Sequence, residues 1–231
     1  MFWALDESGS LVQASPRVKA TCPVCGAAVR SKTGNLVTWH FAHHARWRDC
    51  DTWGENEGYW HYMWKTKVPQ HVREVVIRRP MLENGSPVEV VHRADIVNGR
   101  GEVIELQHSK LSESQIKERE HFYGSMIWLF DFTDSDSDRV VPEGRHTFKS
   151  TRKDSLYSRF KFKRRREGDR DEYEFEWRRA YRWMLGINRP LFIDFGRKDA
   201  IFHMVKFSFS QPCHGWGRFY SKADFLKRFF V

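Results

Sequence analysis

Two neighbouring segments of the chain carry acidic side chains at a spacing that suits metal-assisted hydrolysis. Arg93-Ala94-Asp95-Ile96-Val97 and Val103-Ile104-Glu105-Leu106-Gln107 flank Asn98-Gly99-Arg100-Gly101, a pattern that predicts a β-hairpin. A loop of three or five residues would bring the carboxylates of Asp95 and Glu105 to one face, roughly 5–8 Å apart at Cβ. Mg²⁺ or Mn²⁺ between them would offset their repulsion and activate water for attack on a phosphodiester.

Two simpler outcomes remain open for this hairpin. A loop of two or four residues would send the two carboxylates to opposite faces, because side chains alternate along a strand. Acidic and amide side chains also line the solvent side of ordinary edge hairpins. Glu105 and Gln107 are two residues apart and share a face in either case, so Gln107 joins the candidate site.

A helix expected over residues 55–68 adds further polar groups. Glu57, His61 and Lys65 recur every four residues within an arc of roughly 80°, so one helix face offers a carboxylate, an imidazole and an ammonium. Charge pairing on a surface helix would give the same pattern. Together with the two hairpin carboxylates, these residues form a candidate set of polar groups that is more informative than either part alone.

Metal-binding residue types of another kind lie near the N-terminus. Cys22-Pro23-Val24-Cys25 is followed by His40 and His43. Two thiolates and two imidazoles make the closed tetrahedral set that structural zinc prefers. The histidine pair is closer than usual, so His44 or Cys50 could replace one ligand. Without zinc, the segment would be a reduced cysteine pair beside two partly buried histidines.

The elements around these residues predict an α/β layer structure. The first fifty residues have a hairpin-rich pattern, residues 112–124 predict a helix, and residues 126–132 predict a buried strand. Alternating Asp and Ser at 134–138 predict a linker. Beyond it we expect a helix over 173–185 and a hairpin of 191–195 with 201–209. The expected domains are a zinc-binding module (1–52), a core (53–135) and a basic α+β region (136–231).

Positive charge is concentrated in the C-terminal part. Residues 1–144 contain 17 Lys and Arg against 20 Asp and Glu, whereas residues 145–231 contain 22 against 10. Such a basic half suits nucleic acid, because phosphate contacts release condensed counterions, although a solvated basic surface is the simpler alternative. Aromatic residues there would be stacking platforms or, more simply, core. The candidate contacts are Lys161, Lys163, Arg164, Arg165 and Arg166, with Phe160, Trp177 and Trp183 as the aromatics.

The sequence shows no pattern typical of a membrane span or a secretion signal. The chain has no apolar run of membrane-spanning length, and its first residues do not form a signal-peptide core. Four cysteines are too few for a disulfide scaffold. We therefore expect a cytoplasmic protein without a membrane partner.

Together these residues resemble the competence protein CoiA family of PD-(D/E)xK nucleases. The resemblance covers most of the chain and depends on the order and spacing of its motifs. These are Cys22–Cys25 with His40 and His43, Glu57-x3-His61-x3-Lys65, Asp95, Glu105-x-Gln107-x-Ser109, Arg119 with Tyr123, the Trp128 strand, and Gly215-Trp216-Gly217-Arg218 with Ala223-Asp224-Phe225.

This resemblance implies a restriction-endonuclease-like core, in which helices flank a mixed sheet, and an N-terminal zinc-ribbon-like module. It also implies a role in DNA processing, recombination or transformation, with DNA and recombination proteins as partners. Asp95 and Glu105 would take the metal-binding places, and Glu57 that of the first-helix carboxylate.

Two positions depart from the superfamily pattern: Ala94 stands where proline is usual, and Gln107 where lysine is usual. An amide is poorer than an ammonium at orienting water and offsetting phosphate charge. Lys65 would supply that ammonium from the facing helix, with His61 as proton shuttle, and Lys110 is a poorer substitute. The expected function is a metal-dependent DNA nuclease. The alternatives are a non-catalytic zinc-containing DNA-binding or recombination-accessory protein, and a ribonuclease using the same chemistry.

Overall fold

The chain forms two compact units in the computed structural model, which is of the α/β class expected from the sequence. Residues up to 97 belong to the first unit, and the described residues from 98 onward belong to the second. The domain limits expected at residues 52 and 135 remain predictions. The structure describes residues 1–35, 38–44, 50–51, 53, 57–133, 159–165, 171–196, 199–208, 210 and 212–230.

A small antiparallel sheet begins the first unit and confirms the hairpin-rich pattern of the first fifty residues. Its strands are β1 (Trp3–Leu5), β2 (Leu11–Gln13), β3 (Ala20–Thr21), β4 (Ala28–Lys32) and β5 (His40–His43), in the order β2-β1-β3-β4-β5. Its small core contains Ala4, Ala14, Ala20, Cys22, Val29 and Phe41. So few apolar side chains give limited burial, which favours stabilisation by a bound metal.

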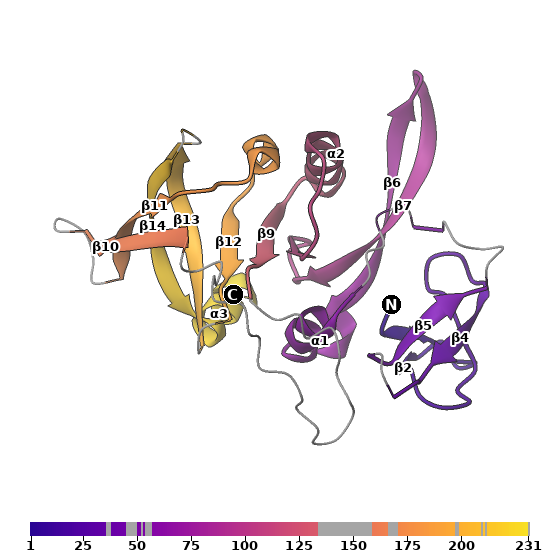
Figure 1. The fold of residues 1–231 in the computed structure, drawn as a ribbon. Helices are drawn as coiled ribbons and strands as arrows, with labels where there is room; N and C mark the ends of the chain where they lie inside the picture. Colours follow the sequence, from indigo (N-terminus) through magenta and orange to yellow (C-terminus); the bar gives the residue numbers. More distant parts are fainter. Residues whose placement is uncertain are drawn as a thin grey trace. The chain divides into compact units, whose positions relative to one another are not determined.

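A helix and a long hairpin complete the first unit. Helix α1 (Tyr59–Thr66) confirms the expected helix in shorter form, and a 3₁₀ turn (Gln70–Val72) follows it. Strands β6 (Arg73–Glu83) and β7 (Ser86–Val97) then pair as a ribbon, turned by Asn84 and Gly85 with positive φ angles of 51° and 80° (Figure 1). A two-residue turn with both φ angles positive matches the twist of the strands.

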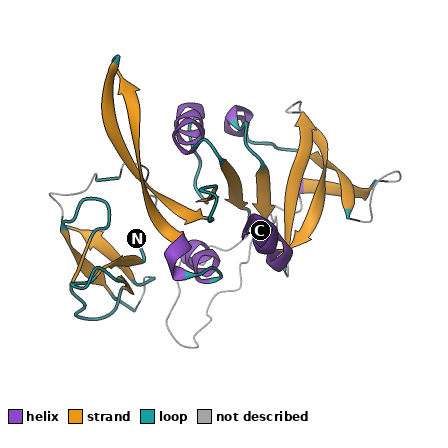
Figure 2. Cartoon of the chain, turned by 180° about the vertical axis from the view of Figure 1, so that it is seen from behind, coloured by secondary structure: helices purple, strands orange, loops and turns teal. Residues whose placement is uncertain are grey.

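The second unit contains a mixed sheet with helices. Strands β8 (Val103–Gln107), β9 (Met126–Asp131) and β12 (Leu191–Asp194) are parallel, and the remaining pairings in this unit are antiparallel. The other elements are β10 (Phe160–Arg164), β11 (Glu172–Trp177), β13 (Ala200–Ser208), β14 (Cys213–Ser221), α2 (Glu113–Tyr123) and α3 (Lys222–Phe230) (Figure 2). The strand order is β10-β11-β14-β13-β12-β9-β8.

Several expected elements of this unit are confirmed. Helix α2 begins with the capping box between Ser112 and Gln115, and β9 is the expected buried strand. The turn before β8 is closed by a hydrogen bond from the Gly101 N–H to the Asn98 oxygen, with Gly101 at φ 77°. The hairpin of β12 and β13 also forms as expected. None of α1, α2 and α3 is long and apolar enough to cross a bilayer.

The prediction of a helix over residues 173–185 is wrong. Residues 172–177 form strand β11, and a 3₁₀ turn covers Arg182–Gly186. Phe175 and Trp177 are buried, whereas Glu174 is exposed and Glu176 is half-buried, so burial repeats every two residues rather than every 3.6. The expected linker at 134–138 lies outside the described residues, and the restriction-endonuclease-like core remains an expectation.

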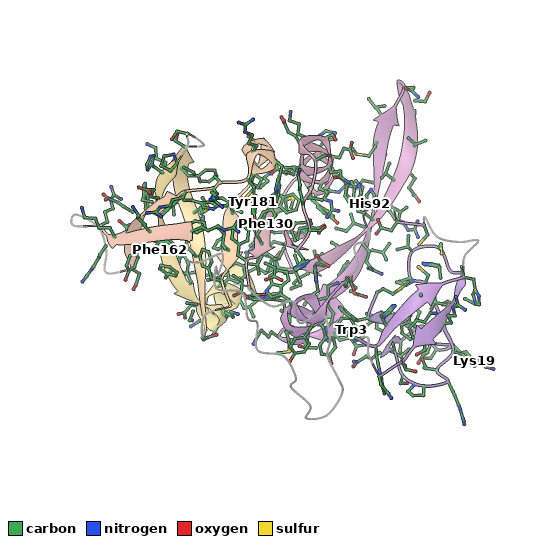
Figure 3. The ribbon with its side chains drawn as sticks, viewed as in Figure 1. Trp3, Lys19, His92, Phe130, Phe162 and Tyr181 are labelled. Carbon is green, nitrogen blue, oxygen red and sulfur yellow. The ribbon has the colours of Figure 1, made fainter. Side chains whose placement is uncertain are left out.

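Aromatic side chains fill the core of the second unit. Phe162 lies in the middle of β10, Tyr181 directly precedes the 3₁₀ turn Arg182–Gly186, and Phe130 lies on β9 (Figure 3). Phe160 stacks on Trp177 with ring centroids 4.8 Å apart, and both are buried. These two aromatics are therefore core, as the simpler alternative held, and are not stacking platforms for nucleic acid.

Candidate metal and carboxylate sites

A cluster of three cysteines and one histidine lies in the first unit. The ligand atoms of Cys22, Cys25, His43 and Cys50 all lie within 4.8 Å of one another. Sγ of Cys50 is 3.7 Å from Sγ of Cys22 and 3.4 Å from Nε2 of His43, which is 3.4 Å from Sγ of Cys25. The four cysteines of the chain are all free thiols. We call these four residues the thiol cluster, which could bind a metal such as zinc.

The distances fit a tetrahedral zinc ion. Zinc bonds of about 2.3 Å to sulfur and about 2.0 Å to nitrogen require edges of about 3.8 Å between sulfurs and about 3.5 Å between sulfur and nitrogen. Burial raises the pKa of Cys50, and the neighbouring Cys22 raises it further. Thiolates crowded in this way repel one another unless a cation lies between them. The chemistry of the donor set therefore suits zinc.

The turn between Cys22 and Cys25 aims both sulfurs at the cluster. The Cys22 N–H donates to the Ala27 oxygen at 2.8 Å, the Gly26 N–H donates to the Cys22 oxygen at 2.9 Å, and Gly26 has a φ angle of 69°. The Val24 N–H points at Sγ of Cys22 from 3.4 Å. Glycine is favoured at Gly26 because side chains with a Cβ rarely adopt that φ.

His40 is not part of this cluster, which corrects the expected ligand set. His40 and His43 are three residues apart on β5, and side chains alternate along a strand, so the two imidazoles leave opposite faces. Nδ1 of His40 instead lies 2.8 Å from the Thr38 oxygen. Cys50, one of the two alternatives, takes the fourth place, while His44 is exposed outside the cluster.

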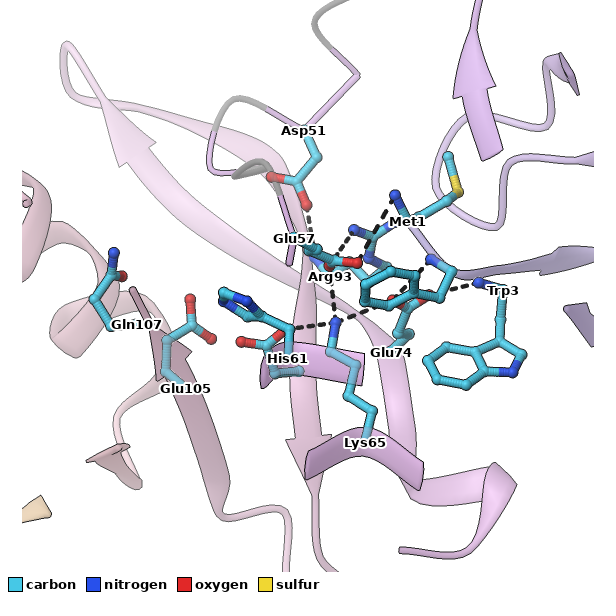
Figure 4. A network of polar contacts seen from close by, with 12 residues as sticks. Met1, Trp3, Asp51, Glu57, His61, Lys65, Glu74, Arg93, Glu105 and Gln107 are labelled. Atoms are coloured by element: carbon cyan, nitrogen blue, oxygen red, sulfur yellow. Dashed lines mark hydrogen bonds and ion pairs between the residues drawn. The ribbon is translucent and has the colours of Figure 1, made fainter. Parts of the chain in front are cut away.

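A buried network of charges lies elsewhere in the first unit (Figure 4). Nζ of Lys65 is 2.8 Å from Oε1 of Glu57, 3.0 Å from Oε1 of Glu74 and 2.7 Å from Oδ1 of Asp95. Nη2 of Arg93 is 3.1 Å from the same oxygen of Glu57. The Lys65 side chain is fully buried. Three carboxylates thus surround one ammonium. We call Lys65, Glu57, Glu74 and Asp95 together the Lys65 cluster.

Electrostatics keep these groups charged despite their burial. Burial alone would lower the pKa of Lys65, but Asp95, Glu57 and Glu74 together hold it above its ordinary value. Burial would likewise raise the pKa of Glu57, and Lys65 and Arg93 lower it well below its usual range. A buried charge is tolerated when partners of opposite sign and hydrogen bonds compensate its desolvation.

Glu74 is the member of the Lys65 cluster that the sequence analysis missed. Glu74 is the second residue of β6 and has a φ angle of 52°, and its carboxylate lies 3.4 Å from both the Phe2 and the Trp3 backbone nitrogens. A lone acid ahead of the β-branched run Val75–Ile77 was the available signal. His61, one turn before Lys65 on α1, is buried, and its Nδ1 accepts from the Gly58 N–H at 3.4 Å.

A short contact path joins the thiol cluster to the Lys65 cluster. Asp51 directly follows Cys50, and its carboxylate binds Nδ1 of His92 at 2.9 Å and the Arg93 N–H at 3.0 Å. Arg93 in turn contacts Glu57. The segment that carries Cys50 is therefore attached to strand β7 two residues before Asp95.

In the second unit, Glu105 and Gln107 share one face of β8, as their spacing predicts. Nη1 of Arg119 from α2 lies 2.6 Å from Oε1 of Glu105 and 3.2 Å from Oε1 of Gln107. Gln107 also donates to the Ser109 oxygen at 2.8 Å. Glu105 is only 5% exposed. Arg119 is one of the residues that carry the family resemblance, but it had no expected role. It is a cationic partner of Glu105.

Asp95 and Glu105 belong to different compact units, Asp95 to the first and Glu105 to the second. Their convergence on one cation remains a prediction. Of the expected catalytic set, the structure brings Glu57, Lys65 and Asp95 together in the first unit, with His61 on the same helix as Lys65.

The basic stretch lies on the edge strand β10 and just beyond it. Lys161, Lys163 and Arg164 are exposed, with Lys161 3.4 Å from Glu176. Arg165 pairs with Glu172 at 3.2 Å and lies over the Trp216 ring. Arg166 lies outside the described residues. An exposed row of cations suits phosphate binding, which stays a prediction for these residues.

The comparisons with known proteins concern the N-terminal segment. Residues 10–52 match the family model of the competence protein CoiA, N-terminal domain. The matched segment contains β2 to β5 and all four residues of the thiol cluster. No curated protein and no solved structure matches the chain significantly. The match supports the CoiA-like resemblance in this segment.

Proposed function

We propose that this protein is a metal-dependent nuclease that hydrolyses DNA phosphodiester bonds in competence-related DNA processing or recombination. The observation that carries the proposal is the 2.7 Å contact between Nζ of Lys65 and Oδ1 of Asp95. The usual motif lysine is replaced by Gln107, and an ammonium held against a metal-binding carboxylate supplies the missing charge. The match of residues 10–52 to the CoiA N-terminal domain supports the biological setting.

Each residue of the proposed site has a distinct task. Asp95, Glu105 and Glu57 would hold Mg²⁺ or Mn²⁺, which when bound polarises the phosphate and lowers the pKa of a water ligand. Lys65 would offset the charge that develops on the phosphate, and His61 would transfer a proton. Gln107 would contribute its amide or its backbone carbonyl. Zinc at the thiol cluster would be structural, because four protein ligands leave no open position.

A specific observation also favours a second function, a zinc-containing DNA-binding or recombination-accessory protein without catalysis. The candidate carboxylates already have cationic partners: Asp95 and Glu57 contact Lys65, and Glu105 contacts Arg119. A catalytic metal would have to compete with these ion pairs. If it cannot, the carboxylates are scaffold.

Cleavage assays separate the two functions. Single-stranded, double-stranded and branched DNA, with RNA in parallel, are incubated with Mg²⁺ or Mn²⁺ and the wild type, Asp95→Asn, Glu105→Gln or Glu89→Gln. Glu89 is the matched control, because it is an exposed acid on β7 whose side chain is 64% accessible. We expect cleavage by the wild type and Glu89→Gln, and a loss of roughly 100-fold or more in the other two variants. Nucleic acid that stays intact, or undiminished cleavage by Asp95→Asn, would overturn the nuclease.

A further inference from the structure

Two adjoining cavities lie where strand β14 runs into helix α3. The larger, of about 870 Å³, is lined by Arg218, Tyr220, Ser221, Lys227 and Arg228, among others. The smaller, of about 260 Å³, is lined by Phe192, His203 and Phe225 and shares Tyr220 and Arg228 with the larger. All of these residues belong to the second unit. None of them has a role in the proposed catalysis.

Flat rings form the smaller cavity. Phe192 and His203 stack with centroids 4.2 Å apart and planes 13° apart, and Phe192 contacts Phe225 at 4.8 Å. Burial and the nearby Arg218 lower the pKa of His203 to about 4, so its imidazole is uncharged at neutral pH. These rings therefore form an aromatic, uncharged part of a lining that also contains Glu102 and Arg228, and a heteroaromatic ring can stack on such a surface.

Cations line the larger cavity. The Arg228 guanidinium lies 4.8 Å from the centre of the Tyr220 ring, and Lys227 beside it is exposed. A guanidinium over a ring keeps its N–H groups in the plane for a phosphate. Arg218 is different, because it forms an ion pair with Glu172. Lys227 and Arg228 are thus the cations best placed to bind an anion.

The main acid of this cavity already has a task in the helix. Asp224 accepts from the Ser221 hydroxyl at 2.7 Å, and the Asp224 N–H donates back to that hydroxyl at 2.9 Å. Together they cap the start of α3, where a carboxylate also compensates the helix dipole. Asp171 is a second acid on the lining, and it is exposed to screening by salt.

We infer that the two cavities bind one nucleotide of a single-stranded nucleic acid, with the base against Phe192, His203 and Tyr220 and the phosphate at Lys227 and Arg228. A stacking wall next to a pair of cations is the arrangement that single-strand binders use, and it tolerates any base because every base has a π face. Tyr220 and Arg228 line both cavities, so this pair would hold the base and its phosphate next to each other. Since the inference concerns binding alone, it does not depend on cleavage.

Fluorescence anisotropy of a labelled single-stranded oligonucleotide, with EDTA added to exclude hydrolysis, tests the site in the full chain. The variants are Lys227→Gln/Arg228→Gln for the phosphate, Tyr220→Leu for the base, and Lys206→Gln as control. Lys206 is exposed on β13 and does not line either cavity. The salt dependence of binding is measured for each.

The two halves of the site should fail in different ways. Tyr220→Leu should weaken binding roughly 5- to 100-fold with an unchanged salt slope, because it removes stacking. The paired charge variant should lower the salt slope by about 0.7, since both cations contact one phosphate and each phosphate neutralised on a single strand contributes about 0.7. Lys206→Gln leaves the stacking rings in place, so its affinity for the oligonucleotide should not show the loss expected for Tyr220→Leu. Thymidine monophosphate should displace the oligonucleotide from the wild type better than thymidine does.

Several outcomes would overturn the inference. One is binding by Tyr220→Leu and by the paired charge variant that equals binding by Lys206→Gln. Another is an equal loss of double-stranded DNA binding in Tyr220→Leu, which would mean a general basic surface. Equal displacement by thymidine and its monophosphate would remove the phosphate role. Should Tyr220→Leu fail to fold by circular dichroism, the paired variant at the exposed positions 227 and 228 decides the result.

Discussion

The ammonium of Lys65 lies 2.7 Å from Asp95 and is shared with two further carboxylates, and it is completely shielded from solvent. A surface ion pair contributes about 0–1 kcal/mol, because solvent screens it. Loss of one partner from a buried pair costs about 3–5 kcal/mol, because the other charge is left uncompensated. The Lys65 cluster therefore belongs to the class of interactions whose removal a denaturation experiment detects easily.

Lys65→Met removes the central cation at nearly constant volume. We expect the free energy of unfolding, measured by urea denaturation, to fall by about 3–5 kcal/mol. Lys117→Met is the matched control, because Lys117 pairs with Glu113 at 2.8 Å on α2 with both side chains more than half exposed. That variant should change stability by less than about 0.5 kcal/mol.

A second substitution tests whether the cost comes from charge. Adding Asp95→Asn to Lys65→Met removes one of the unpaired carboxylates, so the double variant should be less destabilised than additive single effects predict. Strict additivity would show that Lys65 and Asp95 do not interact.

Metal content distinguishes the ligand sets of the thiol cluster. We expect about one zinc per chain in the wild type and in His40→Asn, and a loss of most zinc in His43→Asn and Cys50→Ser, because only the latter two remove a ligand. Cys213→Ser is the matched cysteine control, since Cys213 is a buried free thiol in the second unit. Elemental analysis of purified protein gives the ratio. Zinc lost from His40→Asn but kept in Cys50→Ser would restore the ligand set expected from the sequence.

The glycines of β14 allow close contact with β13. A Cβ at Gly217 would overlap the His203 carbonyl oxygen and the Phe202 ring, and neither backbone nor packed ring can move cheaply. Gly217→Ala should therefore destabilise the protein by about 3 kcal/mol, the upper end of ordinary overpacking. In Gly99→Ala the new methyl meets no atom within 4 Å in the part of the chain that the structure describes, so stability should hardly change. Thermal denaturation compares the two, and equal melting temperatures would contradict the packing.

Stability should fall in acid because of His203. Its pKa is lowered to about 4 in the folded chain, whereas an unfolded histidine titrates near 6.5. The unfolded state therefore takes up the proton first, and the stability present above pH 6.5 is lost as the pH falls toward 4. The positive charge of Arg218 opposes protonation of His203. Two further charged residues, Arg228 and Glu102, line the same cavity as His203, and the negative charge of Glu102 would favour the protonated imidazole.

His203→Gln removes this titration. The stability difference between wild type and variant should shrink from pH 7.5 to pH 5 when urea midpoints are compared. His121→Gln, an exposed histidine on α2, serves as control and should leave the pH dependence of the wild type unchanged. Parallel curves for the wild type and His203→Gln would contradict the assignment.

Local patterns were sufficient to predict the elements that have strong ones. Helix α2 carries a capping box, β9 is a continuous apolar run, and the glycine-rich turn before β8 requires a positive φ. The helix expected at 173–185 failed because aromatic and acidic residues alternate there, and the alternation was assigned the wrong period. Strand β14 was missed because glycine is unfavourable in strands unless close packing requires it, as at Gly217.

The candidate sites were predictable where one element carries the residues. His61 and Lys65 share α1 as expected, whereas Glu57 precedes the helix and reaches Lys65 from outside it. Glu74 comes from β6, whose apolar pattern is interrupted by Arg78, Arg79 and Pro80, so it was not expected beside Lys65. Ligand spacing in the thiol cluster left His40 and Cys50 as alternatives, because spacing alone does not say which face of a strand a histidine occupies.

Asp51 and Glu74 have a consequence for how the first unit melts. Asp51 anchors the segment after Cys50 to His92 and Arg93, and Glu74 holds the backbone of Phe2 and Trp3. Because of these contacts, we expect that cutting the chain at residue 52 would destabilise both pieces. If the thiol cluster holds zinc, its removal by a chelator should loosen strand β7, which carries Asp95, and lower the cooperativity of unfolding of the first unit.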